Sequence, residues 1–160
     1  IPDIGVPEDT CSQSSYVFFG VAASNDLIPS NSGGFVAGIG SLNIALPPIL
    51  NLGSEELKQK FIPPVLAGEK IAALAITEPG GGSDVASLKT TAVRDGDHYV
   101  VNGSKTFITS GCRADQVTCA VRTGGDGASG ISMIVIEKDT PGFSVSKKLK
   151  KTGWWASDTA

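Results

Sequence analysis

The segment ALAITEPGGGSD, residues 73–84, joins a short apolar run to a carboxylate, a proline, three consecutive glycines, a serine and an aspartate. Glycine loops that bind phosphates at a helix N-terminus have the spacing G-x-x-x-x-G-K-[ST] or G-x-G-x-x-G, and neither occurs here. Thr90, Thr91 and Val93, which follow, favour a strand. We therefore expect a glycine loop between strands. Two interpretations stay open: a concavity of N–H groups that binds an anion, or a flexible connection with glycines at positive φ.

The residues before Lys70 favour helices. In residues 15–24 (SYVFFGVAAS) and 35–50 (FVAGIGSLNIALPPIL), apolar residues cluster without strict alternation, which is compatible with buried helices interrupted by Gly and Pro. A short amphipathic helix is expected after Ser54, a candidate N-cap, and Pro63 and Pro64 are expected to end it. We expect residues 1–70 to form a helical part of the protein.

The residues after Lys70 favour short strands. Apolar or β-branched runs occupy residues 70–77, 88–109, 115–123 and 130–139, and turn signals such as DGD and NG lie within or between them. The 20 glycines in 160 residues, well above the average of about 7%, indicate many turns. For residues 71–160 we expect a small antiparallel β-barrel or sandwich, so the predicted fold class is α+β.

Composition excludes several classes of function. The 13 basic and 16 acidic residues give a net charge of −3, so nucleic acid is not an expected partner. No apolar run approaches the roughly 20 residues of a membrane-spanning helix, and residues 1–10 show no signal peptide. Cys11, Cys112 and Cys119 lack C-x-x-C spacing, so we expect buried thiols and no metal site, with a Cys112–Cys119 disulfide as the alternative.

Other candidate catalytic groups are few. His98 is the one histidine and lies beside Gly96 in a predicted hairpin turn, where we expect it to be exposed and not catalytic. The run KKLKK, residues 147–151, is expected to be a solvated face; the alternative is a site for phosphate or a partner protein.

Several blocks of the sequence resemble one family of flavoproteins. AITEPGGGSDVAS, residues 75–87, resembles the signature of the acyl-CoA dehydrogenases at every fixed position, and VVNGSKTFITSG, residues 100–111, resembles the family's next conserved block. The similarity continues through residues 53–80 upstream and through 134–145 and 153–160 downstream. By this resemblance the chain is a fragment containing the end of the N-terminal helical domain, residues 1–70, and most of the middle β domain, residues 71–160.

The resemblance implies FAD as the cofactor and assigns roles to individual residues. Leu74, Ile76 and Thr77 are expected near the isoalloxazine edge, and Gly82 and Ser83 at the pyrophosphate. In the second block an aromatic residue stacks near the ring, an aliphatic one packs, and a threonine donates a hydrogen bond near the reactive flavin nitrogen. These three residues are Phe107, Ile108 and Thr109. Ser83 is also expected to contact the CoA part of an acyl-CoA substrate.

The resemblance also implies the reaction and the partners. The family converts acyl-CoA thioesters to 2-enoyl-CoA and passes the electrons to an electron-transfer flavoprotein. Its catalytic base is a glutamate in a C-terminal helical domain, expected beyond Ala160, so Glu78 is interpreted as structural. A homotetramer is implied, in the cytoplasm of a bacterium or the mitochondrial matrix of a eukaryote. The alternatives are an acyl-CoA oxidase and a non-catalytic flavin or CoA binding module.

Overall fold

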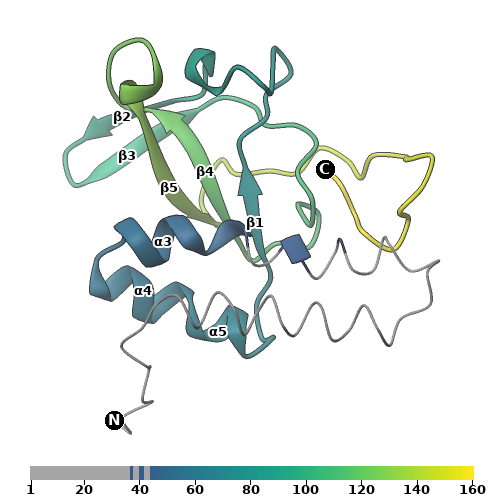
Figure 1. Ribbon diagram of the computed structural model, residues 1–160. Coiled ribbons are helices and arrows are strands. Elements are labelled where there is room, and N and C mark those ends of the chain that lie inside the picture. The colour runs from purple at the N-terminus through teal and green to yellow at the C-terminus, as the bar shows by residue number, and fades with distance from the viewer. Residues whose placement is uncertain (1–36, 38–39, 42–43) are drawn as a thin grey trace, which may run out of the picture.

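The computed structural model describes Ala37, Gly40, Ser41 and residues 44–160 (Figure 1). Within these residues, the short helices α3, α4 and α5 precede a five-stranded sheet along the chain, and Ala37, Gly40, Ser41, Ile44 and Ala45 before them are also helical. The elements are α3 (Pro47–Leu52), α4 (Glu55–Phe61), α5 (Pro63–Leu66), β1 (Ala72–Ala75), β2 (Thr91–Asp95), β3 (His98–Asn102), β4 (Gln116–Arg122) and β5 (Ile131–Glu137), with single-turn 3-10 helices η1 (Val85–Ser87) and η2 (Ala128–Gly130). The helix expected over residues 15–24 and the position of Cys11 lie outside the described residues.

Helix α4 begins as its sequence predicts. The Leu57 N–H donates to Ser54 Oγ at 3.3 Å, and this satisfies one of the N–H groups that a helix start leaves without a partner. The helix ends at Phe61, but Pro63 is the first residue of α5. Proline fits at a first helical position because its missing N–H has no intrahelical acceptor there. The prolines therefore separate two helices and do not end the helical part.

Two of the predicted strand pairs are confirmed. β2 and β3 form an antiparallel hairpin in which Asp95 pairs with His98, and β4 pairs with β5 along its whole length, from Gln116–Glu137 to Arg122–Ile131. The turn between β2 and β3 contains Gly96 at φ 60°, a left-handed conformation that glycine adopts without steric cost. Local turn chemistry therefore predicted both hairpins.

The prediction of an antiparallel barrel or sandwich was wrong in two respects. β1 runs parallel to β4, from Ala72–Gln116 to Ala75–Cys119, and β2 also meets β4 in parallel through Thr91 and Arg122. The described sheet is mixed, has the order β1-β4-β2-β3 with β5 on β4, and does not close into a barrel. Parallel pairing needs a long crossover connection, here residues 76–115, and no local pattern of residues specifies where such a connection leads.

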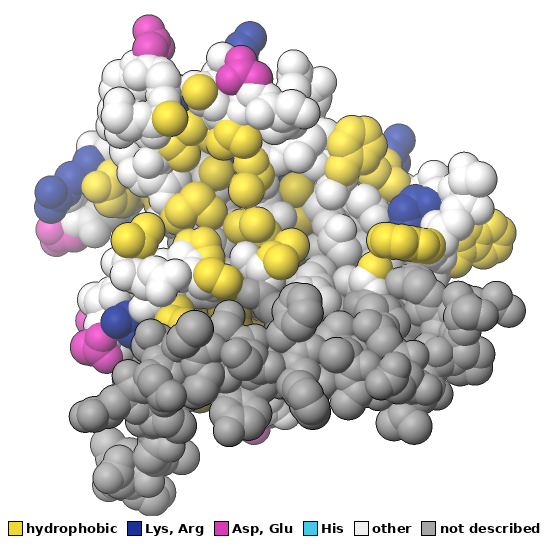
Figure 2. All heavy atoms as spheres, viewed as in Figure 1, with side chains coloured by type: hydrophobic (Ala, Val, Ile, Leu, Met, Phe, Trp, Pro, Cys, Tyr) yellow, Lys and Arg dark blue, Asp and Glu magenta, His cyan; other side chains and the backbone are white. Residues whose placement is uncertain are grey.

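Strand β5 remains partly accessible along its whole length. Every residue of β5 is half-buried, in contrast to β4, which is buried from Gln116 to Val121. Figure 2 shows apolar side chains gathered over the strands β4 and β5 on this face of the molecule.

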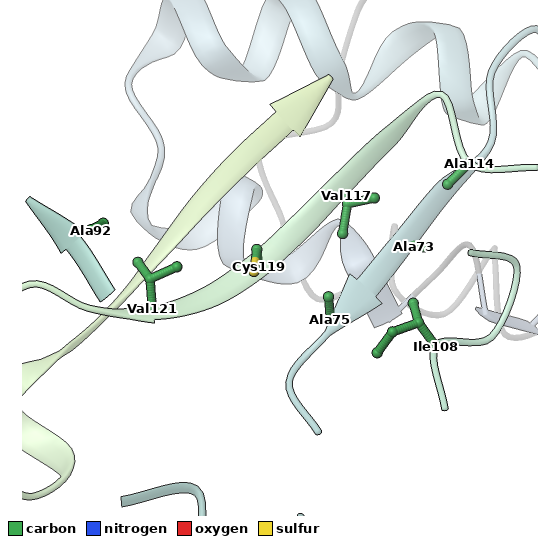
Figure 3. Packing of buried hydrophobic residues seen from close by; sticks show 8 residues of the cluster. All are labelled: Ala73, Ala75, Ala92, Ile108, Ala114, Val117, Cys119 and Val121. Carbon is green, nitrogen blue, oxygen red and sulfur yellow. The ribbon is translucent and has the colours of Figure 1, made fainter. Parts of the chain in front are cut away.

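Two apolar clusters lie against opposite faces of β1. Figure 3 shows the first cluster, which joins β1 to β4 and to the segment after β3; its members are Ala73, Ala75, Ala92, Ile108, Ala114, Val117, Cys119 and Val121. The second cluster packs the helices against the other face of β1, with Leu74 at its border. Alternation of side chains along β1 therefore connects the helical and the strand-rich parts of the chain.

Two expectations about reactive side chains meet different outcomes. Cys119 is buried, as predicted, but Cys112 is exposed, and both thiols are free, so the alternative disulfide does not form. Cys112 lies in the turn that follows Gly111, outside the strands, which is why it escapes the core. His98 is exposed at the start of β3, as predicted.

Among the described residues, no helix has both the length and the apolar character needed to cross a bilayer.

Candidate functional site

Residues 78–84, which we call the glycine segment, follow β1 and are held by the side chain and main chain of Glu78. Its backbone N–H donates to Gly81 O at 3.0 Å, and its backbone oxygen accepts from the Gly81 N–H at 3.1 Å. Its carboxylate accepts from the N–H groups of Lys89 at 2.7 Å and Thr90 at 2.9 Å and from Lys105 Nζ at 2.9 Å. One carboxylate thus ties the glycine segment to the start of β2 and to the segment before Phe107.

The charge state of Glu78 follows from these contacts. Burial by itself raises the pKa of a carboxyl group, but the interactions with the side chains of Thr90 and Lys105 and with the N–H groups of Lys89 and Thr90 outweigh it and lower the pKa of Glu78 to about 2. The side chains of Glu78 and Lys105 are only 9% and 10% exposed. Glu78 is therefore an ionised structural group at neutral pH and a poor proton acceptor.

The glycine segment offers unpartnered backbone donors. The N–H groups of Gly82 and Ser83 have no hydrogen-bond acceptor in the described part of the chain, and Ser83 is exposed. A Cβ at Gly82 would meet Thr77 Cγ2 at 3.1 Å, a tight contact that the Thr77 side chain would have to relieve by moving a few tenths of an ångström. Asp84, the last residue of this segment, makes no side-chain capping bond, and the Glu78 carboxylate anchors the loop instead.

Residues 105–109, the second candidate segment, lie beside the residues that lead from β1 into the glycine segment. The Thr106 N–H donates to Thr77 O at 2.9 Å, and Lys105 Nζ donates to Ile76 O at 3.0 Å. Phe107 follows with a left-handed backbone, φ 59°, and its side chain is 67% exposed. A bulky residue is rare in this conformation, and its ring projects where a partner molecule can cover it.

The C-terminal residues fix the position of Thr109. Ile108 and Ala160 exchange two backbone hydrogen bonds, of 2.8 and 3.0 Å, and the Ser110 N–H donates to Asp158 O at 3.0 Å. The Asp158 carboxylate accepts in turn from the Cys112 N–H and from Arg113. Burial raises the pKa of Asp158, but these two donors outweigh it and lower that pKa below its usual range.

A hollow of about 680 Å³ opens beside Thr109. Its lining is Ala37, Gly40, Ser41, Ile44, Thr109, Lys151, Gly153, Trp154, Ser157 and Thr159. Of the site residues predicted from sequence, Thr109 is the one that lines it. Lys151, part of the run expected to be solvated, is half-buried and donates to Ser157 O.

The structure brings together most, but not all, of the residues predicted to form the site. Ile76 and Thr77 lie beside the segment 105–109, and the backbone of Gly82 lies close to the side chain of Thr77. The Leu74 side chain instead packs on the opposite face of β1, against the helical cluster.

Sequence reasoning missed two long-range anchors of the site. Lys105 donates hydrogen bonds to Glu78 and Ile76, which precede it by 27 and 29 positions. Arg122 donates to four backbone oxygens, at 2.6 to 3.2 Å, which belong to Ala86, Leu88, Gly125 and Gly127. It thereby joins the segment after the glycines to the loop between β4 and β5. Lys105 lies within the block VVNGSKTFITSG, two residues before Phe107, but no role was assigned to it there, and Arg122 lies in none of the quoted motifs.

Comparisons with known proteins identify the family of the chain. Residues 73–160, more than half of the chain, match the family described as "Acyl-CoA dehydrogenase, middle domain". Isobutyryl-CoA dehydrogenase from Bos taurus is 50% identical over 117 residues, which are 73% of this chain and 28% of that protein.

Solved structures are similar over most of the described residues. A probable acyl-CoA dehydrogenase from Mycobacterium abscessus is 58% identical with a TM-score of 0.78, over 80% of this chain and 34% of that one. An acyl-CoA dehydrogenase from Bacillus anthracis, solved in complex with FAD, is 40% identical with a TM-score of 0.71, over 79% of this chain and 22% of that one. The chain spans about a third or less of the length of each relative, and it belongs to the acyl-CoA dehydrogenase family.

Proposed function

We propose that the protein containing this chain is an FAD-dependent acyl-CoA dehydrogenase. It would convert an acyl-CoA thioester to the trans-2-enoyl-CoA and pass the electrons to an electron-transfer flavoprotein. The observation that carries this proposal is the junction of the two candidate segments, in which Lys105 and Thr106 donate to the backbone oxygens of Ile76 and Thr77. That junction holds the end of β1 and the start of the glycine segment beside the residues that lead to Phe107.

The residues present fit FAD. The unpartnered N–H groups of Gly82 and Ser83 suit a pyrophosphate, because successive backbone donors form an anion-binding concavity. The exposed ring of Phe107 offers a stacking surface, and the Thr77 and Thr109 hydroxyls offer hydrogen bonds to a polar ring edge. Bound FAD supplies the hydride acceptor of the reaction.

Leu74 and Ile108 have supporting roles in this proposal. Ile108 is buried in the first apolar cluster and holds its two neighbours, Phe107 and Thr109, at the surface. Leu74 is half-buried at the border of the helical cluster, so besides its proposed place near the isoalloxazine edge it would help to hold β1.

The substrate in this proposal is an acyl-CoA. The hollow beside Thr109 has apolar side chains, among them Ile44 and Trp154, which would surround the acyl group and exclude water from it. Ser83, exposed beside the glycines, would contact the CoA part. Removal of the α proton needs a free base, and we place it in a glutamate beyond Ala160, because Glu78 already accepts three hydrogen bonds.

The wider organisation of the parent protein is also proposed. Residues 1–70 would end its N-terminal helical domain, and residues 71–160 would form most of its flavin-binding domain. The parent would assemble as a homotetramer, in the cytoplasm if it is bacterial and in the mitochondrial matrix if it is eukaryotic. The Bos taurus relative is named as mitochondrial.

The test uses the full-length protein. We expect it to purify with flavin absorption and to lose that absorption when mixed without oxygen with an acyl-CoA. The panel should contain straight chains of several lengths and isobutyryl-CoA, the substrate named for the Bos taurus relative. Rapid oxygen consumption with substrate would show an acyl-CoA oxidase instead. Absence of flavin after reconstitution with excess FAD would refute the proposal.

A further inference from the structure

Lys105 and Glu78 form an ion pair unlike the others in the described residues. Their side chains are 10% and 9% exposed, whereas those of Lys60 and Glu137 are 53% and 42% exposed. Removing two charges from water is costly, and a buried ion pair is often no more stabilising than apolar residues of the same size. Stability alone therefore gives little reason for this pair, and its place in the fold needs another explanation.

The pair lies where the two proposed flavin-binding segments meet. Glu78 belongs to the glycine segment and Lys105 to the segment that leads to Phe107. Lys105 Nζ donates both to Glu78 Oε1 at 2.9 Å and to the backbone oxygen of Ile76 at 3.0 Å. One ammonium group thus bridges a side chain and a peptide oxygen of the facing segment.

The bond to Ile76 O determines how one peptide group is oriented. In a trans peptide the C=O and the N–H point in opposite directions. With its oxygen directed to Lys105, the peptide between Ile76 and Thr77 directs the Thr77 N–H to the other side, where it has no acceptor among the described residues. A backbone donor without a protein acceptor is available to a ligand.

Glu78 keeps Lys105 in this position. The carboxylate is itself fixed by the N–H groups of Lys89 and Thr90, so it cannot follow the lysine if the lysine moves. The four-carbon chain of a lysine is otherwise flexible, and burial beside a fixed carboxylate restricts it.

We propose that Lys105 and Glu78 are positioning residues for the flavin: together they hold the Ile76–Thr77 peptide and the Phe107–Thr109 segment in the arrangement that receives the ring. The inference rests on the proposed function. Neither side chain needs to touch the cofactor, because both act through the backbone that they hold.

The test compares four variants of the full-length protein. Lys105→Met removes the ammonium and leaves a buried carboxylate without its cation. Lys105→Met combined with Glu78→Gln removes both charges and keeps one acceptor oxygen, so the side chain still accepts from one of the N–H groups of Lys89 and Thr90. Lys105→Arg retains a cation, and Lys60→Met breaks the exposed pair with Glu137 as the matched control. Three quantities are measured: the thermal unfolding of the apoprotein, the dissociation constant of FAD, and the absorption spectrum of the bound flavin.

We expect Lys105→Met to lower both the unfolding temperature and the FAD affinity. The double variant should regain part of the unfolding temperature, because no unpaired charge remains, although one of the N–H groups of Lys89 and Thr90 loses its acceptor. Its FAD affinity should stay about tenfold or more below that of the wild type, with a shifted flavin spectrum, since Ile76 O has no donor. Lys105→Arg should recover part of the affinity, and Lys60→Met should match the wild type.

Two results would overturn the inference, and they are distinguishable from failure of the proposed function. A double variant that binds FAD within about twofold of the wild type, with an unchanged spectrum, would show that the pair serves folding alone. Equal losses of FAD affinity in Lys60→Met and in the double variant would show that any change of charge weakens binding. A wild-type protein that binds no FAD would refute the proposed function as well. If Lys105→Met does not fold, the double and Arg variants still decide the question.

Discussion

At the scale of single residues, Thr109 is held more firmly than a surface threonine. Its neighbours Ile108 and Ser110 are bonded to Ala160 and Asp158, and Thr109 itself pairs with Thr159. The hydroxyl is therefore presented at the edge of the hollow by fixed backbone on both sides. Such preorganisation lets one hydrogen bond act on a bound ring without a cost for ordering it.

Thr109→Val should make the reduction potential of the bound flavin more negative. The proposed hydrogen bond stabilises the negative charge of the reduced ring more than the oxidised ring, and valine keeps the shape without the hydroxyl. One hydrogen bond contributes about 0.5 to 1.5 kcal/mol. The potential is measured against redox dyes, with Thr123→Val as the control because that hydroxyl bonds Ser132 in an exposed loop. An unchanged potential in Thr109→Val would remove its hydroxyl from the site.

Glu78 should make the stability of the protein depend on pH in the acid range. Its pKa in the folded protein, about 2, lies below the ordinary value of 4.5. The unfolded chain therefore binds the proton first, and the stabilisation present above about pH 4.5 is lost as the pH falls toward 2. Glu78→Gln should make the free energy of unfolding vary less between pH 5 and pH 2, by about 1 to 3 kcal/mol.

The measurement is chemical denaturation at several pH values. Glu56→Gln, a change at an exposed position in the first turn of α4, is the control and should leave the pH dependence as it is. Asp158 also has a lowered pKa, so the free energy of unfolding of Glu78→Gln will still depend on pH to some extent. Identical slopes for Glu78→Gln and the wild type would contradict the assignment of a strongly bonded carboxylate.

At the scale of elements, Arg122 connects two loops that no hydrogen-bonded ladder joins. Its guanidinium donates to oxygens on both sides, those of Ala86 and Leu88 and those of Gly125 and Gly127. A planar group with five donors can satisfy four acceptors at once, and a lysine cannot. The segment after the glycines and the loop between β4 and β5 are thus held as one unit.

Arg122→Lys should loosen residues 123–130 and the turn η1 together. We expect faster amide hydrogen exchange in both segments and a loss of about 1 to 3 kcal/mol in the free energy of unfolding. Arg94→Lys is the matched control, because Arg94 makes a single exposed bond to Gly96 O. Faster exchange confined to residues 123–130 would show that the two loops move independently.

Elements whose partners are close in sequence could be predicted, and those with distant partners could not. The β2–β3 hairpin, the β4–β5 pair and the Ser54 N-cap each depend on residues within one turn or loop. The parallel pairing of β1 with β4 depends on a partner more than forty residues away, and the bonds of Lys105 on partners 27 and 29 residues away. The sequence of either partner alone has no feature that specifies such a contact.

For the candidate site, the resemblance to the family identified the residues, and the structure shows which hydrogen bonds hold them together. Ile76, Thr77 and Phe107 could be singled out from motifs, but the reason that they lie together is the bonding of Lys105 and Thr106. Leu74 was placed by its position in the motif, whereas alternation along β1 turns its side chain to the helices.

At the scale of the whole molecule, the 160-residue chain expressed alone should not oxidise an acyl-CoA, even when it is loaded with FAD. A positioned general base typically accelerates such a step by about 100- to 10,000-fold. The buried carboxylates of the described residues are already bound to cations, Glu78 to Lys105 and Asp158 to Arg113. The chain also spans only 28% of the length of its Bos taurus relative.

The experiment mixes the FAD-loaded chain with acyl-CoAs of short, medium and long chain in the absence of oxygen and follows the flavin absorption. The full-length protein serves as the positive control and should lose the absorption. Loss of the absorption with the 160-residue chain alone would place the base within it, and the assignment of that role to a residue beyond Ala160 would then be wrong.

The parallel pairing of β1 with β4 has a consequence for the order of events during synthesis on the ribosome. The β2–β3 hairpin closes between near neighbours and can form as soon as both strands emerge, whereas β1 emerges first and has to wait for Gln116–Cys119. During that interval Ala72–Ala75 has an unsatisfied strand edge, the state in which nascent chains associate wrongly. Its four residues, three of them alanine, make that edge short and weakly apolar, which limits the hazard while the partner strand is being made.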